Sequence, residues 1–399
     1  MQLIEDTIQR YKKIYGSEPS YIVTAPGRIN LIGEHTDYNL GYVLPVAIDR
    51  SIIIAVGNRR DKMLFLHTVD LQASVSSSLA KLEYDSTALW SNYPKGVAYI
   101  FQNNGYKLQG ANFCIRGNIP IGAGLSSSAA LEVASAIAFN TLNGLQLPDI
   151  ELIKISQLAE TDFVGVQCGI MDQFISMIGK SNYALFLDCK SLEYRYIPFP
   201  KQLKLVVCDT GVKRELRNSA YNQRQLECVE AVNELNKKYK TINSLRDITL
   251  DHLRESDDSL SSISMKRAMH VVTENIRVLA SVQALESNDY KKLGELMIES
   301  HKSLRDDYEV SNKELDVCVD ILLKIDGVYG ARMTGAGFGG SVICLAKQDA
   351  IDTIVERLRT EYQRNIGRSI TIYLASSGDG AKIFDLRNSA IPLDEAQTT

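Results

Sequence analysis

Two kinds of segment that would place a protein in or across a membrane are missing from this sequence. No apolar run approaches the roughly 20 residues that a membrane-spanning helix needs. The N-terminal stretch MQLIEDTIQRYKKIYG is polar and amphipathic, and it has no apolar core of the kind that a signal peptide carries. We therefore expect a cytoplasmic protein that does not bind a membrane.

Other absences narrow the chemistry. The formal net charge of −4 provides no basic footprint for nucleic acid. The seven cysteines are scattered and contain no CxxC pair, so we expect free, buried thiols rather than a disulfide framework or a zinc site. The motif GxxxxGK[ST] does not occur, which excludes a P-loop with its phosphate-binding lysine.

The patterns that are present mix strands and helices. Short β-rich runs lie at 21–25, 51–57, 63–67, 111–117, 183–188 and 204–209, and helical patterns lie at 93–104, 127–143 and 150–163. After Asp209, helices dominate near 213–239, 264–285, 290–305, 311–324 and 349–364, with two late strands, GSVICLA and SITIYLA. The acidic, serine-rich stretch 254–264 is predicted to be a solvated loop.

The length of 399 residues is more than one hydrophobic core usually serves. Strands mixed with helices in both halves predict an α+β fold. We place the boundary between two domains near 200–210, which gives an N-terminal domain at 1–205 and a C-terminal domain at 206–399. The sequence does not decide whether the last strand belongs to the C-terminal domain or returns to the N-terminal domain.

The strongest local signal for binding is GNIPIGAGLSSSAALEVASAIAFN at residues 117–140. Pro120, Gly122 and Gly124 keep the backbone open, and three serines then begin an alanine-rich helix. Serine is a preferred N-cap, and the first turn of a helix leaves unpaired N–H groups with a partial positive charge. A capped turn needs one serine and one glycine. This loop has more of both, and it predicts a phosphate-binding site.

A second glycine cluster, MTGAGFGGSVICLA at 333–346, contains a literal GxGxxG pattern at Gly335, Gly337 and Gly340. It lies between two predicted strands and not before a helix, so it fails the context of a dinucleotide-binding fingerprint. Two interpretations stay open. It is either a hairpin that needs small residues or a second glycine-rich wall that lets the backbone approach a ligand closely.

A third stretch, AETDFVGVQCGIMDQFISMIGK at 159–180, places carboxylates beside glycines. Glu160 is predicted near the end of one helix and Asp172 in the first turn of the next. An aspartate there can simply complement the helix dipole. Its functional interpretation is a carboxylate held for proton abstraction or for metal ligation.

The segment GRINLIGEHTDY at 27–38 concentrates charge around a short apolar run. It contains Arg28, Glu34, His35 and Asp37. Charged residues are costly to bury without partners, so a strand core rarely holds this many.

Together these stretches resemble the GHMP family of small-molecule kinases. APGRINLIGEHTDYNLGYVLPVAID at 25–49 is similar to the galactokinase signature at nearly every position, and PIGAGLSSSAALE and MTGAGFGGS are similar to the second and third motifs of the family. The resemblance implies an N-terminal domain like domain 2 of ribosomal protein S5, a ferredoxin-like C-terminal domain, and an active site in the cleft between them. It also implies a monomeric enzyme that uses ATP and Mg²⁺ to phosphorylate the anomeric hydroxyl of galactose, the first committed step of galactose utilisation.

The resemblance further implies roles for individual residues. Asp172 would be the general base, and Arg28 would hold it ionised and offset charge on the transferring phosphoryl group. The sugar would be bound by Glu34, His35, Thr36, Asp37, Gly169 and Tyr221. ATP would be bound by Gly122, Ala123, Gly124, Leu125, Ser126, Ser127 and Ser128, with Trp90 and Tyr93 near the adenine. Ser128 and Glu160 would hold Mg²⁺, a hard cation that prefers oxygen ligands.

Three alternatives remain open from the sequence. Trp90 and Tyr93 are as compatible with an ordinary core at the start of a helix. The substrate could be N-acetylgalactosamine or a non-sugar alcohol, although the complete GEHTDY run argues against the latter. The chain could also be a sugar- and ATP-binding sensor without turnover, which the uninterrupted phosphate loop and the presence of Asp172 and Arg28 disfavour.

Overall fold

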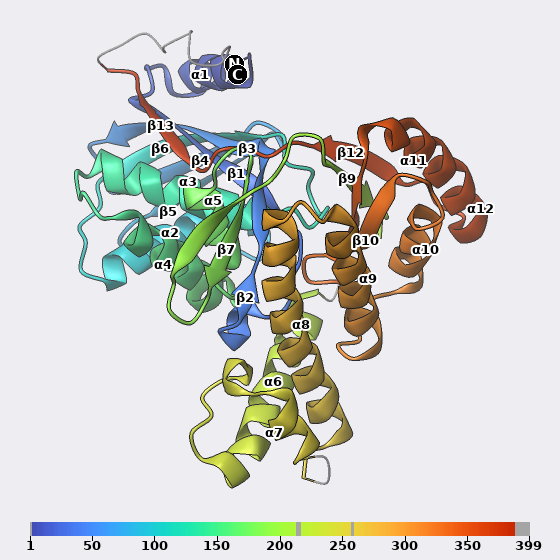
Figure 1. The fold of residues 1–399 in the computed structure, drawn as a ribbon. Coiled ribbons are helices and arrows are strands. Elements are labelled where there is room, and N and C mark those ends of the chain that lie inside the picture. Colours follow the sequence, from blue (N-terminus) through green and yellow to red (C-terminus); the bar gives the residue numbers. More distant parts are fainter. Residues whose placement is uncertain (1, 213–216, 257–258, 388–399) are drawn as a thin grey trace.

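Helices and strands are mixed throughout the computed structural model, which describes residues 2–212, 217–256 and 259–387 (Figure 1). The strands form sheets of six, four and three strands. This arrangement agrees with the predicted α+β class. None of the helices in the described ranges combines the length and the apolar character that crossing a bilayer would require.

The largest sheet has the strand order β13-β1-β3-β6-β4-β5. Neighbouring strands are antiparallel except for the parallel pair β4 and β6. In β4 the side chains of Leu64, Leu66 and Thr68 are buried and those between them are less so, as expected for a half-buried strand. The bounds are β1 (Tyr21–Asn30), β3 (Pro45–Arg59), β4 (Met63–Thr68), β5 (Ala73–Ser78), β6 (Gly110–Gly117) and β13 (Lys382–Asp385).

Helices cover both faces of this sheet. Helices α3 and α5 pack against β1 on the face where Val23 joins the main hydrophobic core. Successive strand residues point to opposite faces, so Ile22 and Ile53 lie on the other face, where they pack against Tyr11 of α1. The bounds are α1 (Gln2–Tyr15), α2 (Asn92–Asn103), α3 (Ser127–Leu142), α4 (Asp149–Leu158) and α5 (Met171–Ile178).

The second half of the chain builds an antiparallel sheet of order β10-β11-β9-β12. Its strands are β9 (Lys204–Asp209), β10 (Val328–Thr334), β11 (Ser341–Ala346) and β12 (Thr371–Ala375), and its helices are α9 (Tyr290–Asp306), α10 (Lys313–Leu322), α11 (Ile351–Arg357) and α12 (Gln363–Ile366). After β12 the chain returns, and β13 pairs with β1 of the large sheet (Figure 1). A small sheet joins β2 (Tyr42–Val43), β7 (Tyr183–Asp188) and β8 (Tyr194–Pro198).

A helical arm projects at the bottom of Figure 1. It consists of α6 (Arg217–Tyr239), α7 (Leu250–Arg254) and α8 (Ser262–Glu286). The predicted start of the first of these helices, at 213–216, lies outside the described residues. The loop predicted at 254–264 was wrong at both ends, because Arg254 is the last residue of α7 and Ser261 caps α8 by accepting a hydrogen bond from the Ser264 N–H at 3.0 Å. Residues 257–258 of that stretch lie outside the described residues.

Helix α9 crosses β10 with the two backbones in contact. A side-chain carbon on Gly294 would lie 1.9 Å from the Tyr329 carbonyl oxygen, and one on Gly330 would lie 2.4 Å from the Gly294 carbonyl oxygen. Only glycine fits at either position. The close crossing fixes β10, whose last residue, Thr334, reaches the site described below.

We predict that Gly294→Ala destabilises the fold by about 2–3 kcal/mol, because the added methyl group must push the backbone of β10 away from the helix. Urea unfolding followed by circular dichroism measures the change. Glu299→Ala, at an exposed position of the same helix, is the matched control and should change stability by less than about 0.5 kcal/mol. Equal stability of the two variants would contradict the prediction.

Candidate active site

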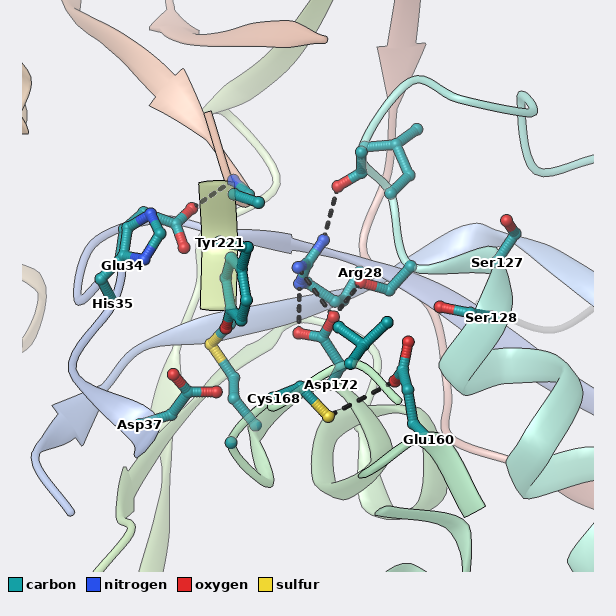
Figure 2. A pocket seen from close by; sticks show the side chains of 18 of the residues that line it. Arg28, Glu34, His35, Asp37, Ser127, Ser128, Glu160, Cys168, Asp172 and Tyr221 are labelled. Carbon is teal, nitrogen blue, oxygen red and sulfur yellow. Dashed lines mark hydrogen bonds and ion pairs between the residues drawn. The ribbon is translucent and has the colours of Figure 1, made fainter. Parts of the chain in front are cut away.

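A polar pocket lies where the two halves of the chain meet (Figure 2). The first half contributes β1 and the loop after it, the glycine-rich loop before α3, and the start of α5, while Tyr221, Gly335 and Ala336 come from the second half. Of the predicted site residues, the pocket brings together Arg28, Glu34, His35, Asp37, Tyr93, Gly122, Gly124, Leu125, Ser126, Ser127, Ser128, Glu160, Gly169, Asp172 and Tyr221. The other three, Thr36, Ala123 and Trp90, belong to the described chain but do not line this pocket.

Arg28 reaches the pocket from an irregular point in the pairing of β1 with β3. Pro26 pairs with Ser51 and Arg28 pairs with Ala47, so Gly27 lies opposite the three residues 48–50 of β3 and the extra residues belong to β3. Gly27 is required there because a side-chain carbon would lie 2.5 Å from the Leu125 carbonyl oxygen. The Arg28 N–H donates to the same carbonyl at 3.1 Å. This close approach holds β1 against the glycine-rich loop.

The Arg28 guanidinium and the Asp172 carboxylate form a two-pronged ion pair at the centre of the pocket (Figure 2). Nε donates to Oδ1 at 2.8 Å and Nη2 donates to Oδ2 at 2.9 Å. Burial acts to lower the pKa of Arg28, but the carboxylates of Asp172 and Glu34 outweigh it, so the pKa is raised. Arg28 is a permanent cation, and Asp172, with 25% of its side chain exposed, stays accessible from the pocket.

Side chains of the protein engage two carbonyl groups of the glycine-rich loop. Arg28 Nη1 donates to the Gly124 carbonyl at 2.6 Å, and the Ser341 hydroxyl donates to the Ala123 carbonyl at 2.6 Å. Gly122 and Gly124 have φ angles of 82° and 77°, which glycine adopts without strain. With these carbonyls already paired, the amides at the start of α3 can face an anion.

Ser126, the serine before α3, does not cap this helix, contrary to the general expectation for a serine at that position. It has a left-handed φ of 58° and its side chain makes no capping hydrogen bond. Its hydroxyl donates instead to the Asp172 carboxylate. Because that cap is missing, the first amides of α3 remain available to a ligand.

The loop after β1 carries the predicted sugar contacts. Glu34 Oε1 accepts from the Gly335 N–H at 2.7 Å and from the Thr334 hydroxyl at 3.0 Å, so the second glycine cluster positions this carboxylate. The Thr36 hydroxyl lies 2.6 Å from the Tyr42 carbonyl oxygen, to which it donates. Thr36 therefore closes the loop with its side chain.

Asp37 packs directly on Gly169. A side-chain carbon at Gly169 would lie 2.2 Å from the carboxyl carbon and from Oδ2 of Asp37. Burial, followed by the neighbouring Asp172 carboxylate, raises the pKa of Asp37 to about 7. The missing side chain at residue 169 thus makes room for a carboxyl group that exchanges its proton near neutral pH.

Gln173, which the sequence did not single out, holds Glu160, and Glu132, also missed, bonds to Gln173. Gln173 Nε2 donates to Glu160 at 2.9 Å and to Glu132 at 3.0 Å. Glu132 lies on α3 one turn after Ser128, and burial together with Glu160 raises its pKa well above the usual range. Its charge in an otherwise alanine-rich helix was the available signal.

Ser128 and Glu160 line the same pocket from α3 and from the turn after α4 (Figure 2). Within the described residues, no group of three or more His, Cys, Asp or Glu side chains could hold a metal ion. A hydroxyl and a carboxylate are nevertheless oxygen donors, which suit Mg²⁺ when phosphate oxygens and waters complete its ligands. The donor set fits that ion.

A second cavity adjoins the glycine-rich loop. It is lined by Trp90, Tyr93, Ser127 and Ser128 and by apolar side chains such as Leu131. The two aromatic rings are partly buried against the main core and also line this cavity, so they pack on one side and stay open to a ligand on the other.

The sequence matches three family descriptions in chain order. The galactokinase galactose-binding signature covers residues 9–58, the GHMP kinases N terminal domain covers 92–180, and the GHMP kinases C terminal domain covers 281–364. A galactokinase of Roseiflexus sp. strain RS-1 is 45% identical over 372 residues, which span 93% of this chain and 95% of the relative. The chain belongs to the galactokinase family of GHMP kinases. A galactokinase of Thermotoga petrophila is also 45% identical, over 90% of this chain and 99% of its own length.

Solved structures share the fold of this galactokinase-family chain. Lactococcus lactis galactokinase complexed with galactose superposes with a TM-score of 0.90 at 35% identity, over 95% of this chain and 99% of that one. Methanococcus jannaschii mevalonate kinase shares the fold at a TM-score of 0.60 and 20% identity, over 90% of this chain and 98% of its own. The GHMP kinase architecture predicted from the motifs is confirmed.

We predict that Gly169→Ala raises the dissociation constant for galactose, the ligand of the Lactococcus relative, by about tenfold or more, because the new methyl group displaces the Asp37 carboxyl group. ATP affinity should stay close to that of the wild type. Calorimetric titration measures both. Gln167→Ala, at an exposed position of the same loop, should leave sugar binding unchanged, and wild-type sugar affinity in Gly169→Ala would show that Asp37 moves freely.

We also predict that Asp37 makes the ligand-free protein less stable as the pH rises. Its pKa is 3.8 ordinarily and about 7 in the fold, so between these values only the folded state keeps the proton. The free energy of unfolding then falls with pH, by at most about 1.4 kcal/mol per unit. Asp37→Asn should therefore gain stability over the wild type between pH 5 and pH 8 in thermal unfolding.

Asp320→Asn, a neutralised carboxyl at an exposed position of α10, is the control for the effect of net charge. Its stability should follow the wild type across this range. The prediction fails if Asp37→Asn also runs parallel to the wild type.

Proposed function

We propose that this chain catalyses the ATP-dependent phosphorylation of the anomeric hydroxyl of α-D-galactose, which yields galactose 1-phosphate and ADP. The position of the Arg28–Asp172 pair carries the proposal. Arg28 bonds to Gly124 of the glycine-rich loop on one side and to Asp172 on the other, and Glu34 and Asp37 line the same pocket. A sugar and a terminal phosphate bound on these two sides would meet at Asp172.

The sugar side of the pocket is rich in hydrogen-bond acceptors. The contacts of Glu34 with Thr334 and Gly335 all end on Oε1, and we propose that Oε2 accepts from a sugar hydroxyl. Asp37 would accept from another hydroxyl, and the ring of Tyr221 lies 5.4 Å from that of His35 and closes the pocket beside it. An epimer that misplaces a hydroxyl would leave one of these buried polar groups unpaired, which supports discrimination among hexoses.

The nucleotide side combines backbone amides with an apolar cavity. The amides at the start of α3 would bind the phosphates, since the carbonyls of Ala123 and Gly124 in the loop are already paired with side chains of the protein. Trp90 and Tyr93 line the adjoining cavity, which would take the adenine.

Phosphoryl transfer depends mostly on positioning and electrostatics, because its transition state is loose and spreads charge over the equatorial oxygens. Arg28 would offset that charge. A sugar hydroxyl has a high pKa, so we infer that Asp172 orients it and takes its proton late in the reaction. The two contacts from Arg28 and the contact from Ser126 hold the carboxylate in one orientation for this role.

We propose that Ser128 and Glu160 hold Mg²⁺ together with phosphate oxygens of ATP. Bound there, the ion would neutralise part of the charge on the phosphates. Gln173 would fix the orientation of the Glu160 carboxylate, as outer-shell partners of metal ligands commonly do.

We further propose that the chain divides into domains at residues 1–205 and 206–399 and works as a cytoplasmic monomer. A boundary in this region is supported by β9, the first strand of the four-stranded sheet, which begins at Lys204, two residues before the proposed second domain. Strand β13 of the second domain returns to pair with β1 of the first. The cytoplasmic location is supported by the seven cysteines, all of which are free, as expected for a protein in a reducing compartment.

A coupled ADP-release assay over a panel of hexoses tests the proposed function, with the position of the phosphate determined on the product. We expect ADP release with galactose and a phosphate on its anomeric carbon. Faster turnover of N-acetylgalactosamine would instead identify a kinase for that sugar. Sugar binding with no ADP release from any hexose would identify a sensor.

In the same assay, we predict that Asp172→Asn lowers kcat at least about 100-fold, because the amide cannot take the proton of the hydroxyl. The dissociation constant for galactose should change by less than about fivefold, since the hydrogen-bonding shape of the side chain is kept. Asp162→Asn, at an exposed position of the turn after α4, is the matched control. A kcat near that of the control would remove Asp172 from the catalytic role.

A further inference from the structure

A chain of hydrogen bonds runs from the sugar side of the pocket into the interior of the protein. His35 Nδ1 lies 2.7 Å from the Tyr38 hydroxyl, which lies 2.8 Å from the Tyr308 hydroxyl. The Tyr308 hydroxyl lies 3.0 Å from Cys228 Sγ, and Asn39 Nδ2 donates to that sulfur at 3.6 Å. We call these five residues the histidine relay.

The relay lies almost entirely out of contact with solvent. His35, Asn39, Cys228 and Tyr308 are each no more than 4% exposed. They come from the loop after β1, from α6 and from the turn after α9, so three segments far apart in sequence are needed to form the relay. Polar groups buried this deeply are costly unless they pair with one another.

Every titrating group in the relay is neutral near pH 7. Burial lowers the pKa of His35 well below its usual value and raises the pKa values of Tyr38 and Tyr308 well above theirs. Burial also raises the pKa of the Cys228 thiol to about 11. The ring, the two hydroxyls and the thiol therefore carry one exchangeable hydrogen each. The three hydrogen bonds that join these groups can all donate toward His35 or all donate toward Cys228.

Asn39 decides the direction. Its Nδ2 also donates to the His35 carbonyl at 2.9 Å, and a carbonyl can only accept, so the amide must turn its NH₂ group toward Cys228. The sulfur then accepts from Asn39 and donates its own hydrogen to Tyr308. In the opposite direction the sulfur, a weak acceptor, would receive two hydrogen bonds, and its S–H would have no acceptor among the described residues.

With this direction, Tyr308 donates to Tyr38 and Tyr38 donates to His35 Nδ1. The single ring hydrogen of His35 must then lie on Nε2. This nitrogen is buried and has no hydrogen-bond partner among the described residues, and His35 lines the pocket. The backbone carbonyl of Ala336 acts to raise the pKa of the ring, but it does not meet hydrogen-bond geometry with Nε2.

We propose that the histidine relay fixes the Nε2–H tautomer of His35, so that the ring donates a hydrogen bond to an oxygen of the bound sugar. Tyr38, Tyr308 and Cys228 are then positioning residues for sugar recognition, and none of them touches the sugar. The identity of the sugar rests on the proposed function, whereas the tautomer does not. Ring packing keeps the imidazole in place, since its centroid lies 4.8 Å from that of Tyr308.

Nitrogen-15 NMR of the ligand-free protein tests the tautomer directly. The chain has five histidines, and the resonances of His35 are identified by their loss in His35→Gln. We expect the pattern of an Nε2–H ring in the wild type and a mixture of both tautomers in Tyr308→Phe and Cys228→Ala. Cys228→Ser keeps a donor at the end of the relay and should restore the wild-type pattern.

Tyr362→Phe is the matched control, because this buried tyrosine donates to the Thr210 carbonyl at 3.2 Å outside the relay. It should leave the His35 resonances unchanged. An Nδ1–H ring in the wild type, or an unchanged ring in both Tyr308→Phe and Cys228→Ala, would overturn the proposal. Thermal unfolding checks that each variant is folded, and the Cys228 pair gives an answer if Tyr308→Phe is not.

Kinetics then connect the relay to the sugar. Tyr308→Phe should raise the KM for galactose by about fivefold while kcat stays within about twofold, as expected for the loss of one oriented neutral hydrogen bond in binding. In a panel of monodeoxygalactoses, the analogue that lacks the oxygen facing His35 should lose this sensitivity. Equal sensitivity of every analogue would contradict a directed contact, whereas failure of the proposed function would show as absent ADP release in the wild type.

Discussion

The ion pair between Arg28 and Asp172 is the interaction on which the site depends. A guanidinium that is only 4% exposed needs a carboxylate partner, and a carboxylate at the centre of a pocket needs a cation. The same pair gathers three segments, because Arg28 bonds to Gly124 of the glycine-rich loop and Ser126 bonds to Asp172 of α5. The close approach of Gly27 to Leu125 of the glycine-rich loop delivers the arginine to this meeting point.

The second half of the chain holds the sugar side of the site, although the sugar loop belongs to the first half. Glu274 of α8 accepts from the Gly33 N–H at 2.9 Å, and Arg332 of β10 donates to the Asn30 carbonyl at 3.0 Å. These contacts act on backbone groups at the base of the loop, while Gly335 acts on the Glu34 side chain at its tip. Sugar recognition and the association of the two halves are therefore parts of one structure.

The sequence predicted features that depend on short spacing and missed those that depend on distant partners. The strand alternation of β4, the long helices and the glycines before α3 are local patterns. The sequence therefore predicted each of these elements from neighbouring residues alone. The conformation of Ser126 could not, because its hydroxyl is satisfied by Asp172, 46 positions away. Gln173 and Glu132 were missed for the same reason, since their link spans 41 positions.

Strand β13 has a consequence for how the protein folds. It pairs with β1 along Tyr21 to Thr24, so one side of β1 is covered only by a strand that lies far along the chain. Bringing together residues so distant in sequence is costly in entropy, so we expect this pairing to form late in folding. Until β13 docks, that side of β1 is an unpaired strand edge, which is a template for pairing with other chains.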